Sequence, residues 1–218
     1  MQKKLLRTKC LFLDLDGTIV DSTEAYLEAA KVSFQAVGLA PPSDGVALEI
    51  PKRLEQGLSL TDYTNGETKK FLSTYMKTYY AITPRKTKLI ANVEETLGLL
   101  SQKKKLALVT MRHVPRETLQ KELEFFGISK YFSHVVTALD TAKPKPSPDA
   151  LLSCVDSFGV DIGDCVIVGD SINDVRAGKA AGAGTVAVLS GLFGFGELAK
   201  EKPDLILNDI TALPQYIV

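Results

Sequence analysis

The stretch Leu11-Phe-Leu-Asp-Leu-Asp-Gly-Thr18 decides the fold of this chain, because a short apolar run ends there in two aspartates. Side chains alternate between the two faces of a strand, so Asp14 and Asp16 point the same way if the strand continues through them. If the strand ends at Asp14, both lie at its carboxyl edge, where open α/β sheets bind ligands. Two such close carboxylates repel each other and indicate a bound cation, a shared proton or phosphoryl chemistry. Two solvated acids at a strand end are the alternative interpretation.

Most of the chain alternates short apolar runs with helix-like stretches. This pattern is typical of an α/β fold with a parallel sheet that helices cover on both faces. The predicted strands are Lys9–Leu15, Leu106–Thr110, His134–Thr137, Cys165–Val168, Gly184–Leu189 and Asp204–Leu207. The predicted helices are Asn92–Lys104, Pro115–Phe126, Pro148–Phe158 and Asn173–Ala181.

Residues 21–85 differ from the rest because they contain no convincing strand. The segment Asp21-Ser-Thr-Glu24 matches a capping box with Asp21 as the N-cap, and Gly38 is placed to end that helix. Further helices are expected over Pro51–Leu58 and Gly66–Tyr80, with a return linker over Ile82–Lys86. We therefore predict a helical domain at 21–85, inserted into a core made of residues 1–20 and 86–218. One continuous α/β domain is the alternative.

The composition excludes several classes of protein. Among 218 residues, Lys plus Arg equals Asp plus Glu at 26 each, which gives no argument for a nucleic-acid partner or a membrane surface. No apolar run is long enough to span a bilayer, and Asp14 interrupts the apolar stretch after the basic start, so a signal-peptide core is lacking. The three cysteines are widely spaced in apolar contexts, which indicates reduced thiols. We expect a cytoplasmic protein, with a monomer as the default.

Three further clusters fall at the ends of predicted strands. Thr110 ends one strand, Lys143-Pro-Lys-Pro146 follows the next, and Gly169-Asp-Ser-Ile-Asn-Asp174 ends a third. Each cluster alone has an ordinary explanation, such as a solvated lysine in a loop. Because all of them lie at carboxyl ends of strands and in this order, together they predict one site at that edge. The glycine-rich segment Gly191–Gly196 matches no phosphate-binding loop and is predicted to be a mobile loop near the mouth of the site.

These motifs resemble those of the haloacid dehalogenase-like hydrolase family, in its phosphatase branch. The family pattern is D-x-D-x-T, a Ser or Thr at a strand end, a Lys, and G-D-x-x-x-D. The chain matches it at Asp14–Thr18, Thr110, Lys143 and Gly169–Asp174. The resemblance implies a Rossmann-like doubly wound parallel sheet with an inserted α-helical cap domain. Across the whole chain, the sequence is most similar to the phosphoglycolate phosphatase group.

The resemblance also implies roles in a phosphatase reaction. Asp14 is then the nucleophile that forms an aspartyl-phosphate, and Asp16 is the general acid and base. A bound Mg²⁺ is then held by the carboxylates of Asp14 and Asp170 and by the backbone carbonyl of Asp16. Asp174 either ligates this ion through water or holds Lys143.

Other residues are then expected to bind the substrate. The resemblance gives Thr110 and Lys143 the task of holding the phosphoryl oxygens, and Gly17 and Met111 lie beside the motif residues. Arg112 and Arg53 are weaker candidates, as is Lys52, because each is otherwise an ordinary solvated charge.

Several activities remain open at this point. The leading hypothesis is a Mg²⁺-dependent phosphatase of a small phosphorylated metabolite, since Asp16 is an acid that carbon–halogen cleavage does not need. A sugar phosphomutase, a pyrophosphatase or a nucleotidase would use the same motifs. A non-catalytic binding protein on the same fold is the remaining alternative.

Overall fold

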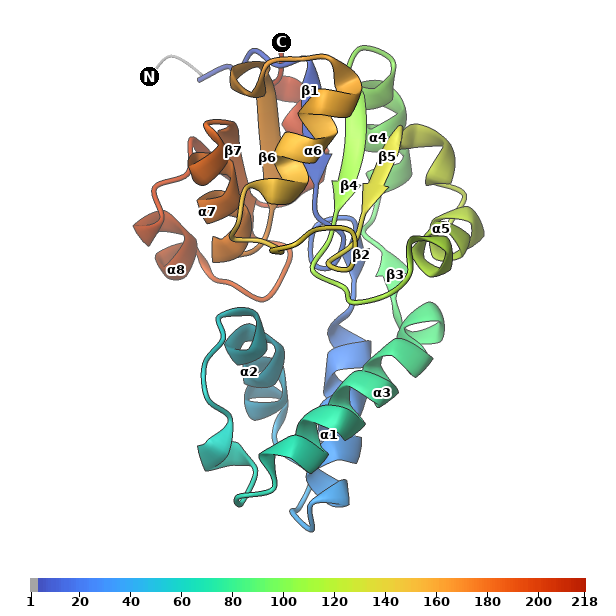
Figure 1. Cartoon of the computed structure of the whole chain (residues 1–218), viewed down its shortest axis with the longest axis vertical. Coiled ribbons are helices and arrows are strands. Elements are labelled where there is room, and N and C mark those ends of the chain that lie inside the picture. Colours follow the sequence, from blue (N-terminus) through green and yellow to red (C-terminus); the bar gives the residue numbers. More distant parts are fainter. Residues whose placement is uncertain (1–3) are drawn as a thin grey trace. The chain divides into compact units, whose positions relative to one another are not determined.

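The structure is a computed structural model that describes residues 4–218, so residues 1–3 of the predicted core and basic start lie outside the described residues. The chain divides into two compact units (Figure 1). One consists of Met1–Val20 with Leu89–Val218, and the other of Asp21–Lys88. The chain passes between them through β2 (Val20–Asp21) and β3 (Lys88–Leu89), which pair with each other. The second boundary therefore falls after Lys88 and not at the predicted residue 85.

The larger unit is built on a six-stranded sheet in which every neighbouring pair of strands is parallel, with the order β5-β4-β1-β6-β7-β8. The strands are β1 (Cys10–Leu13), β4 (Lys105–Val109), β5 (His134–Val136), β6 (Cys165–Gly169), β7 (Gly184–Val188) and β8 (Leu205–Leu207). All six predicted strands are present, and their ends differ from the predicted ones by two residues at most. The predicted α/β class is confirmed.

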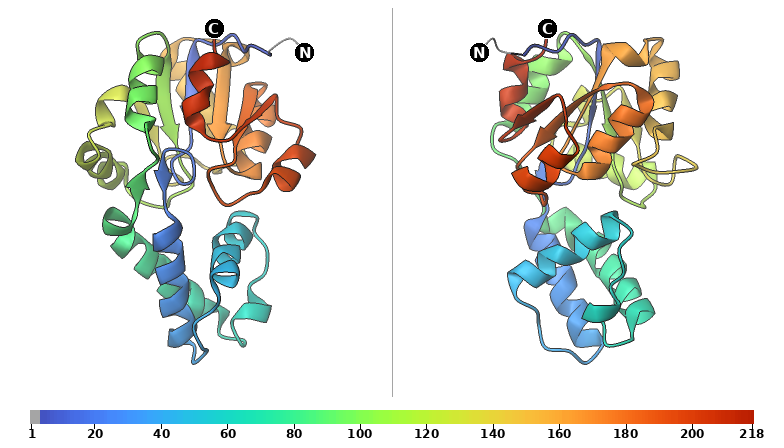
Figure 2. Two further views of the ribbon diagram at one scale, coloured as in Figure 1. Left: turned by 180° about the vertical axis from the view of Figure 1, so that it is seen from behind. Right: turned by 90° about the vertical axis from the view of Figure 1, so that its left-hand side faces the viewer.

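Helices cover both faces of this sheet. They are α4 (Val93–Ser101), α5 (Arg116–Phe125), α6 (Asp149–Phe158), α7 (Ile172–Ala181) and the short α8 (Phe195–Lys200). Short 3₁₀ turns of this unit are η2 (Ser129–Tyr131), η3 (Ile162–Asp164) and η4 (Ile210–Gln215), and η1 (Thr61–Tyr63) belongs to the helical unit. The period of two along β1 explains the layers: Leu11 and Leu13 pack with α4, α5 and η4, whereas Cys10 and Phe12 pack with α6 and α7. Figure 1 shows α6 in front of the sheet, and the left view of Figure 2, from the opposite side, shows α4 (green) and η4 (red) over the other face.

The ends of the central strands are level with one another. Leu13, the last residue of β1, is in register with Leu108 of β4 and with Val168 of β6. The sheet hydrogen bonding continues for one more residue, because the Asp14 N–H donates to the Val168 carbonyl at 3.0 Å. Since parallel strands place their carboxyl ends at one edge, the residues that follow β1, β4 and β6 are brought together there.

The smaller unit is helical and has a core of its own. It contains α1 (Thr23–Ala36), α2 (Asp44–Glu55) and α3 (Thr68–Lys86). Aromatic side chains dominate this core: Phe34 meets Phe71 edge-on at a centroid distance of 5.2 Å, and Tyr26 stacks on Tyr79 at 5.2 Å. Such pairs add to the hydrophobic burial, so this unit has the packing of a genuine domain.

Two local predictions for this unit are wrong. Ser22 holds the N-cap position of α1 without a side-chain cap bond, although the Asp21 carboxylate accepts from the Thr23 N–H at 2.9 Å. No capping box forms there, and Glu24 pairs with Lys88 at 2.7 Å. The predicted linker at 82–86 is helical, because α3 continues to Lys86 with Pro84 inside it. Pro84 has no N–H group, so the helix lacks one backbone hydrogen bond there, and the helix continues beyond it.

Within residues 4–218, no helix combines the length and the apolar character that crossing a membrane requires.

Candidate active site

Three buried carboxylates meet at the carboxyl edge of the sheet. Asp14 follows β1, Asp170 follows β6, and Asp174 lies in the first turn of α7. Each offers one carboxylate oxygen, and these three oxygens lie within 4.8 Å of one another. The three residues are only 7%, 5% and 1% exposed, respectively. Buried charges of one sign at this distance require compensation by a cation.

Part of that compensation comes from Lys145. Its Nζ lies 2.6 Å from Asp14 Oδ1, 2.6 Å from Asp174 Oδ1 and 2.8 Å from the Val109 carbonyl oxygen. Lys145 is only 3% exposed, so its ammonium group is inside the carboxylate cluster. One lysine against three carboxylates still leaves an excess of negative charge.

The prediction of Lys143 as the site lysine is wrong. Lys143 is exposed to solvent, whereas Lys145 is buried beside Asp14. Lys145 lies in a turn in which the Ser147 N–H donates to the Pro144 carbonyl at 3.0 Å, and its ammonium group reaches Asp14 and Asp174. Lys145 therefore replaces Lys143 as the candidate in every role that the sequence assigned to the lysine.

Burial and the neighbouring charges shift the pKa values of both Asp14 and Lys145. Burial raises the pKa of Asp14 to about 7, Lys145 acts against this, and the charges of Asp174 and Asp16 raise the pKa further. Burial alone would lower the pKa of Lys145, but Asp14 and Asp174 outweigh it and raise that pKa. The lysine is therefore charged, and Asp14 holds a proton more readily than an ordinary aspartate.

Glycines let the backbone close around these carboxylates. A Cβ atom on Gly169 would lie 2.0 Å from Asp174 Oδ2, and one on Gly191 would lie 1.8 Å from Asp170 Oδ2. Gly17, at φ +77°, would place its Cβ 2.6 Å from the Asp170 carboxylate. The loop that begins at Gly191 also contributes a contact, because the Leu192 N–H donates to Asp170 Oδ2 at 2.9 Å. A compact all-oxygen site enclosed in this way suits a small hard cation such as Mg²⁺.

Asp174 is fixed by both of its oxygens. Oδ1 accepts from Lys145, and Oδ2 accepts from the Ser171 N–H at 3.1 Å. The Ser171 hydroxyl in turn accepts from the Asn173 N–H at 2.9 Å, which completes a capping box at the start of α7. The sequence left two roles open for Asp174: ligating the ion through water or holding the lysine. The structure shows Asp174 in contact with a lysine, and that lysine is Lys145.

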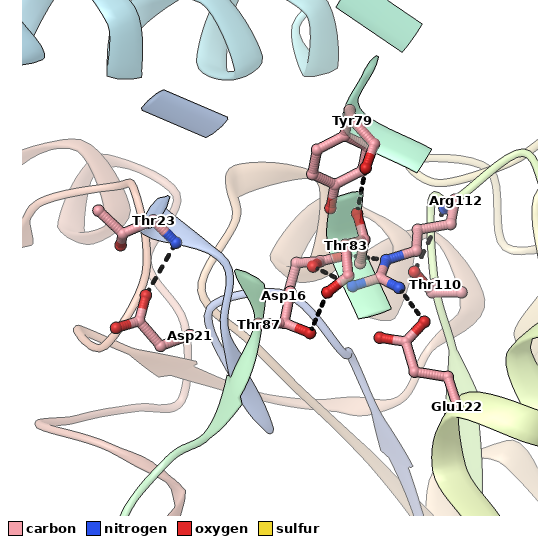
Figure 3. A network of polar contacts seen from close by, with 9 residues as sticks. All are labelled: Asp16, Asp21, Thr23, Tyr79, Thr83, Thr87, Thr110, Arg112 and Glu122. Carbon is pink, nitrogen blue, oxygen red and sulfur yellow. Dashed lines mark hydrogen bonds and ion pairs between the residues drawn. The ribbon is translucent and has the colours of Figure 1, made fainter. Parts of the chain in front are cut away.

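Asp16 belongs to a second ionic group, shown in Figure 3. Arg112 donates to both of its carboxylate oxygens, from Nη2 to Oδ1 at 2.6 Å and from Nε to Oδ2 at 2.7 Å. Arg112 Nη1 donates to Glu122 Oε2 at 2.7 Å. Arg112 is 5% exposed, so it is not the solvated loop charge that its sequence context suggested.

Sequence reasoning missed Glu122 entirely. It lies on α5, ten residues after Arg112 along the chain, in a helix whose other acids, Glu117 and Glu124, are exposed. Nothing local distinguishes it from them. Only the period of the helix gives a signal, since Glu122 lies next to Leu123 and three residues after Leu119 on the buried side.

The remaining predicted residues lie in two places. Thr110 directly follows β4, and its hydroxyl oxygen accepts from the Arg112 N–H at 3.2 Å, which leaves the hydroxyl proton available to donate. Gly17 is buried, and Met111 is half-buried next to Thr110. Arg53 belongs to the helical unit, where its Nε donates to the Ser59 carbonyl at 2.9 Å.

Lys52 precedes Arg53 on α2 and is half-buried. A substrate-binding role for Lys52 or Arg53 stays a prediction.

A parallel α/β core with clustered aspartates and a buried lysine at its carboxyl edge defines a hydrolase of the haloacid dehalogenase-like type. The model of the haloacid dehalogenase-like hydrolase family matches residues 11–188, and the chain belongs to that family.

Relatives with assigned names are similar over almost the whole chain. The chain is 30% identical to the phosphoglycolate phosphatase of Escherichia coli K12, over 92% of this chain and 88% of that protein. It is 29% identical to a Caldanaerobacter subterraneus protein with a provisional pyrophosphatase name, PpaX, over 97% and 96% of the two chains. A crystal structure described as a predicted phosphoglycolate phosphatase from Haemophilus somnus superposes with a TM-score of 0.75 at 27% identity, over 95% of this chain and 97% of that one.

Proposed function

We propose that the protein is a Mg²⁺-dependent phosphatase that hydrolyses a small-molecule phosphomonoester through an aspartyl-phosphate on Asp14. The observation that carries this proposal is the position of Asp14. Its carboxylate lies at the open edge of the sheet, 2.6 Å from a buried lysine and next to two further buried aspartates. A phosphate dianion can approach an anionic nucleophile only where fixed positive charge offsets the repulsion.

The donor set fits Mg²⁺. Asp14 and Asp170 would hold the ion, together with the backbone carbonyl of Asp16, while Asp174 keeps Lys145 in place. The fit rests on the close group of buried carboxylate oxygens and on the glycine backbone that closes around Asp170. When bound, Mg²⁺ supplies positive charge that offsets the phosphoryl group and the carboxylates.

The residues of the chain perform the two displacements. The Asp14 carboxylate attacks phosphorus, the bond to the leaving oxygen breaks, and Asp16 gives its proton to that oxygen. Water then attacks the same phosphorus, Asp16 takes a proton from it, and the Asp14 carboxylate is released. Thr110 offers its hydroxyl proton to a phosphoryl oxygen, and the positive charge of Lys145 offsets the phosphoryl charge. Such positioning and charge compensation account for much of the catalysis in phosphoryl transfer.

The names of the relatives support a class of substrate. The name of the E. coli relative supports phosphoglycolate or a similarly small phosphorylated metabolite as the substrate. The PpaX relative supports pyrophosphate as the second candidate.

The three cysteines are free and buried, which supports a cytoplasmic location.

A panel assay tests this proposal. Phosphate release is measured from phosphoglycolate, sugar phosphates, nucleotides and pyrophosphate, each with Mg²⁺ and with a chelator. We expect Mg²⁺-dependent release concentrated on one or a few compounds. A folded protein that releases no phosphate from any of them contradicts the proposal, and conversion of one sugar phosphate into its isomer favours the phosphomutase.

A further inference from the structure

The ionic group of Asp16, Arg112 and Glu122, here called the arginine clamp, goes beyond what the phosphatase reaction requires. Thr110 and Lys145 already serve the phosphoryl group, yet the chain places a buried guanidinium against its general acid and base. Arg112 makes two hydrogen bonds to Asp16 and one to Glu122, all between 2.6 and 2.7 Å (Figure 3).

This geometry conflicts with the work of Asp16. A general acid must present an oxygen to the leaving group within hydrogen-bond reach. Here both oxygens of Asp16 accept from one guanidinium, in the fork arrangement that is among the strongest contacts a carboxylate can make. Both oxygens of Asp16 thus face Arg112, so proton transfer to a leaving oxygen in the proposed reaction would require Arg112 to loosen its hold.

Glu122 is a second carboxylate with which Arg112 can pair. Its Oε2 accepts from Arg112, but its Oε1 is buried and has no hydrogen-bond partner among residues 4–218. A buried acceptor without a donor is unfavourable, so the present state does not use Glu122 fully. The guanidinium fork matches any carboxylate, so Arg112 can make with Glu122 the paired bonds that it now makes with Asp16.

We propose that Arg112 is a positioning residue with two pairing states, and that Glu122 is the acceptor that lets it release Asp16. In the resting state, Arg112 holds Asp16 by two bonds and Glu122 by one. In the working state, Arg112 pairs with both oxygens of Glu122, and Asp16 turns to the leaving oxygen. This inference rests on the proposed function, because it assigns a task to the acid and base of that reaction.

The variant Glu122→Gln tests the working state by blocking it. Its amide oxygen can still accept one bond from Arg112, but its NH₂ group cannot accept the other, so the paired state is blocked with almost no change of shape. Glu117→Gln is the matched control, because it makes the same substitution at an exposed position of the same helix.

Leaving-group dependence provides a readout that a general loss of structure would not change. The leaving oxygen of an alkyl phosphate needs a proton, whereas that of p-nitrophenyl phosphate leaves with little help from an acid. When the first displacement is irreversible, kcat/KM reports that displacement. For the alkyl phosphate that the wild type hydrolyses fastest, we expect Glu122→Gln to lower kcat/KM by about 30-fold or more. For p-nitrophenyl phosphate, we expect a change within about threefold, and Glu117→Gln should match the wild type with both substrates.

A second variant links the effect to the guanidinium. Adding Arg112→Lys to Glu122→Gln removes the fork that holds Asp16, so the ratio of the two kcat/KM values should return toward that of the wild type. A crystal structure with Mg²⁺ and vanadate should show Arg112 paired with both oxygens of Glu122.

The outcomes separate the two proposals. Equal losses with both substrates in Glu122→Gln, or Arg112 still paired with both oxygens of Asp16 in the vanadate complex, overturn the arginine clamp alone. A wild-type protein without Mg²⁺-dependent phosphate release overturns the proposed function and the clamp together.

Discussion

Replacing Lys145 by methionine tests the placement of the site lysine by stability alone. The Lys145 ammonium donates to Asp14, Asp174 and the Val109 carbonyl, all buried, so its removal leaves two carboxylates without their cation. Removing one partner from a buried ion pair costs about 3–5 kcal/mol. Lys143 is exposed to solvent, so Lys143→Met should change the free energy of unfolding by less than about 0.5 kcal/mol.

Urea unfolding followed by circular dichroism, in a chelator so that no divalent cation compensates, measures both variants. The loss in Lys145→Met should shrink as the pH is lowered, because the stranded carboxylates then take up protons in the folded state. Equal effects of the two substitutions, or a loss of less than about 1 kcal/mol in Lys145→Met, would refute the placement of Lys145 in the cluster.

Four further predictions concern catalysis and the metal. Asp14→Asn should abolish phosphate release while circular dichroism shows an intact fold; wild-type turnover would exclude Asp14 as the nucleophile. Asp16→Ala should lower kcat by roughly 10²–10⁴-fold with little change in KM, and an effect on KM alone would contradict its acid and base role. Gly191→Ala should weaken Mg²⁺ binding by about 10–100-fold in calorimetry, because the added Cβ meets Asp170, whereas Gly196→Ala, with open space around it, should not. Because the pKa of Asp14 is raised to about 7, Mg²⁺ must displace a proton there, so its affinity should fall as the pH drops from about 8 to about 6; a constant affinity would contradict this.

The sequence predicts the core well because each signal in it is local. Apolar runs mark the strands, and the residues that directly follow β1, β4 and β6 are the ones that meet at the carboxyl edge. Asp14, Thr110 and Asp170 could therefore be assigned to one site from their positions alone.

The lysine could not be assigned in this way. Lys143 and Lys145 occupy equivalent places in the repeated Lys-Pro pattern, and only the folded loop shows which of them reaches Asp14. A difference of two residues in an irregular loop leaves no trace in composition or periodicity.

The errors in the helical unit have a similar cause. The linker predicted over Ile82–Lys86 belongs to α3, which passes through Pro84 and buries Tyr79 and Thr83. Tertiary packing here outweighs a local propensity. The arginine clamp was also beyond prediction, because Glu122 becomes distinctive only when the fold places it against Arg112.

Trapping the covalent intermediate tests the central claim most directly. The wild-type protein is mixed with Mg²⁺ and its best substrate, quenched in acid within milliseconds, digested with trypsin and examined by mass spectrometry. The account predicts a phosphorylated peptide 10–31 with the phosphoryl group on Asp14, and no such peptide from Asp14→Asn. Rapid turnover with no phosphorylated peptide, or with the phosphoryl group on another residue, would contradict it.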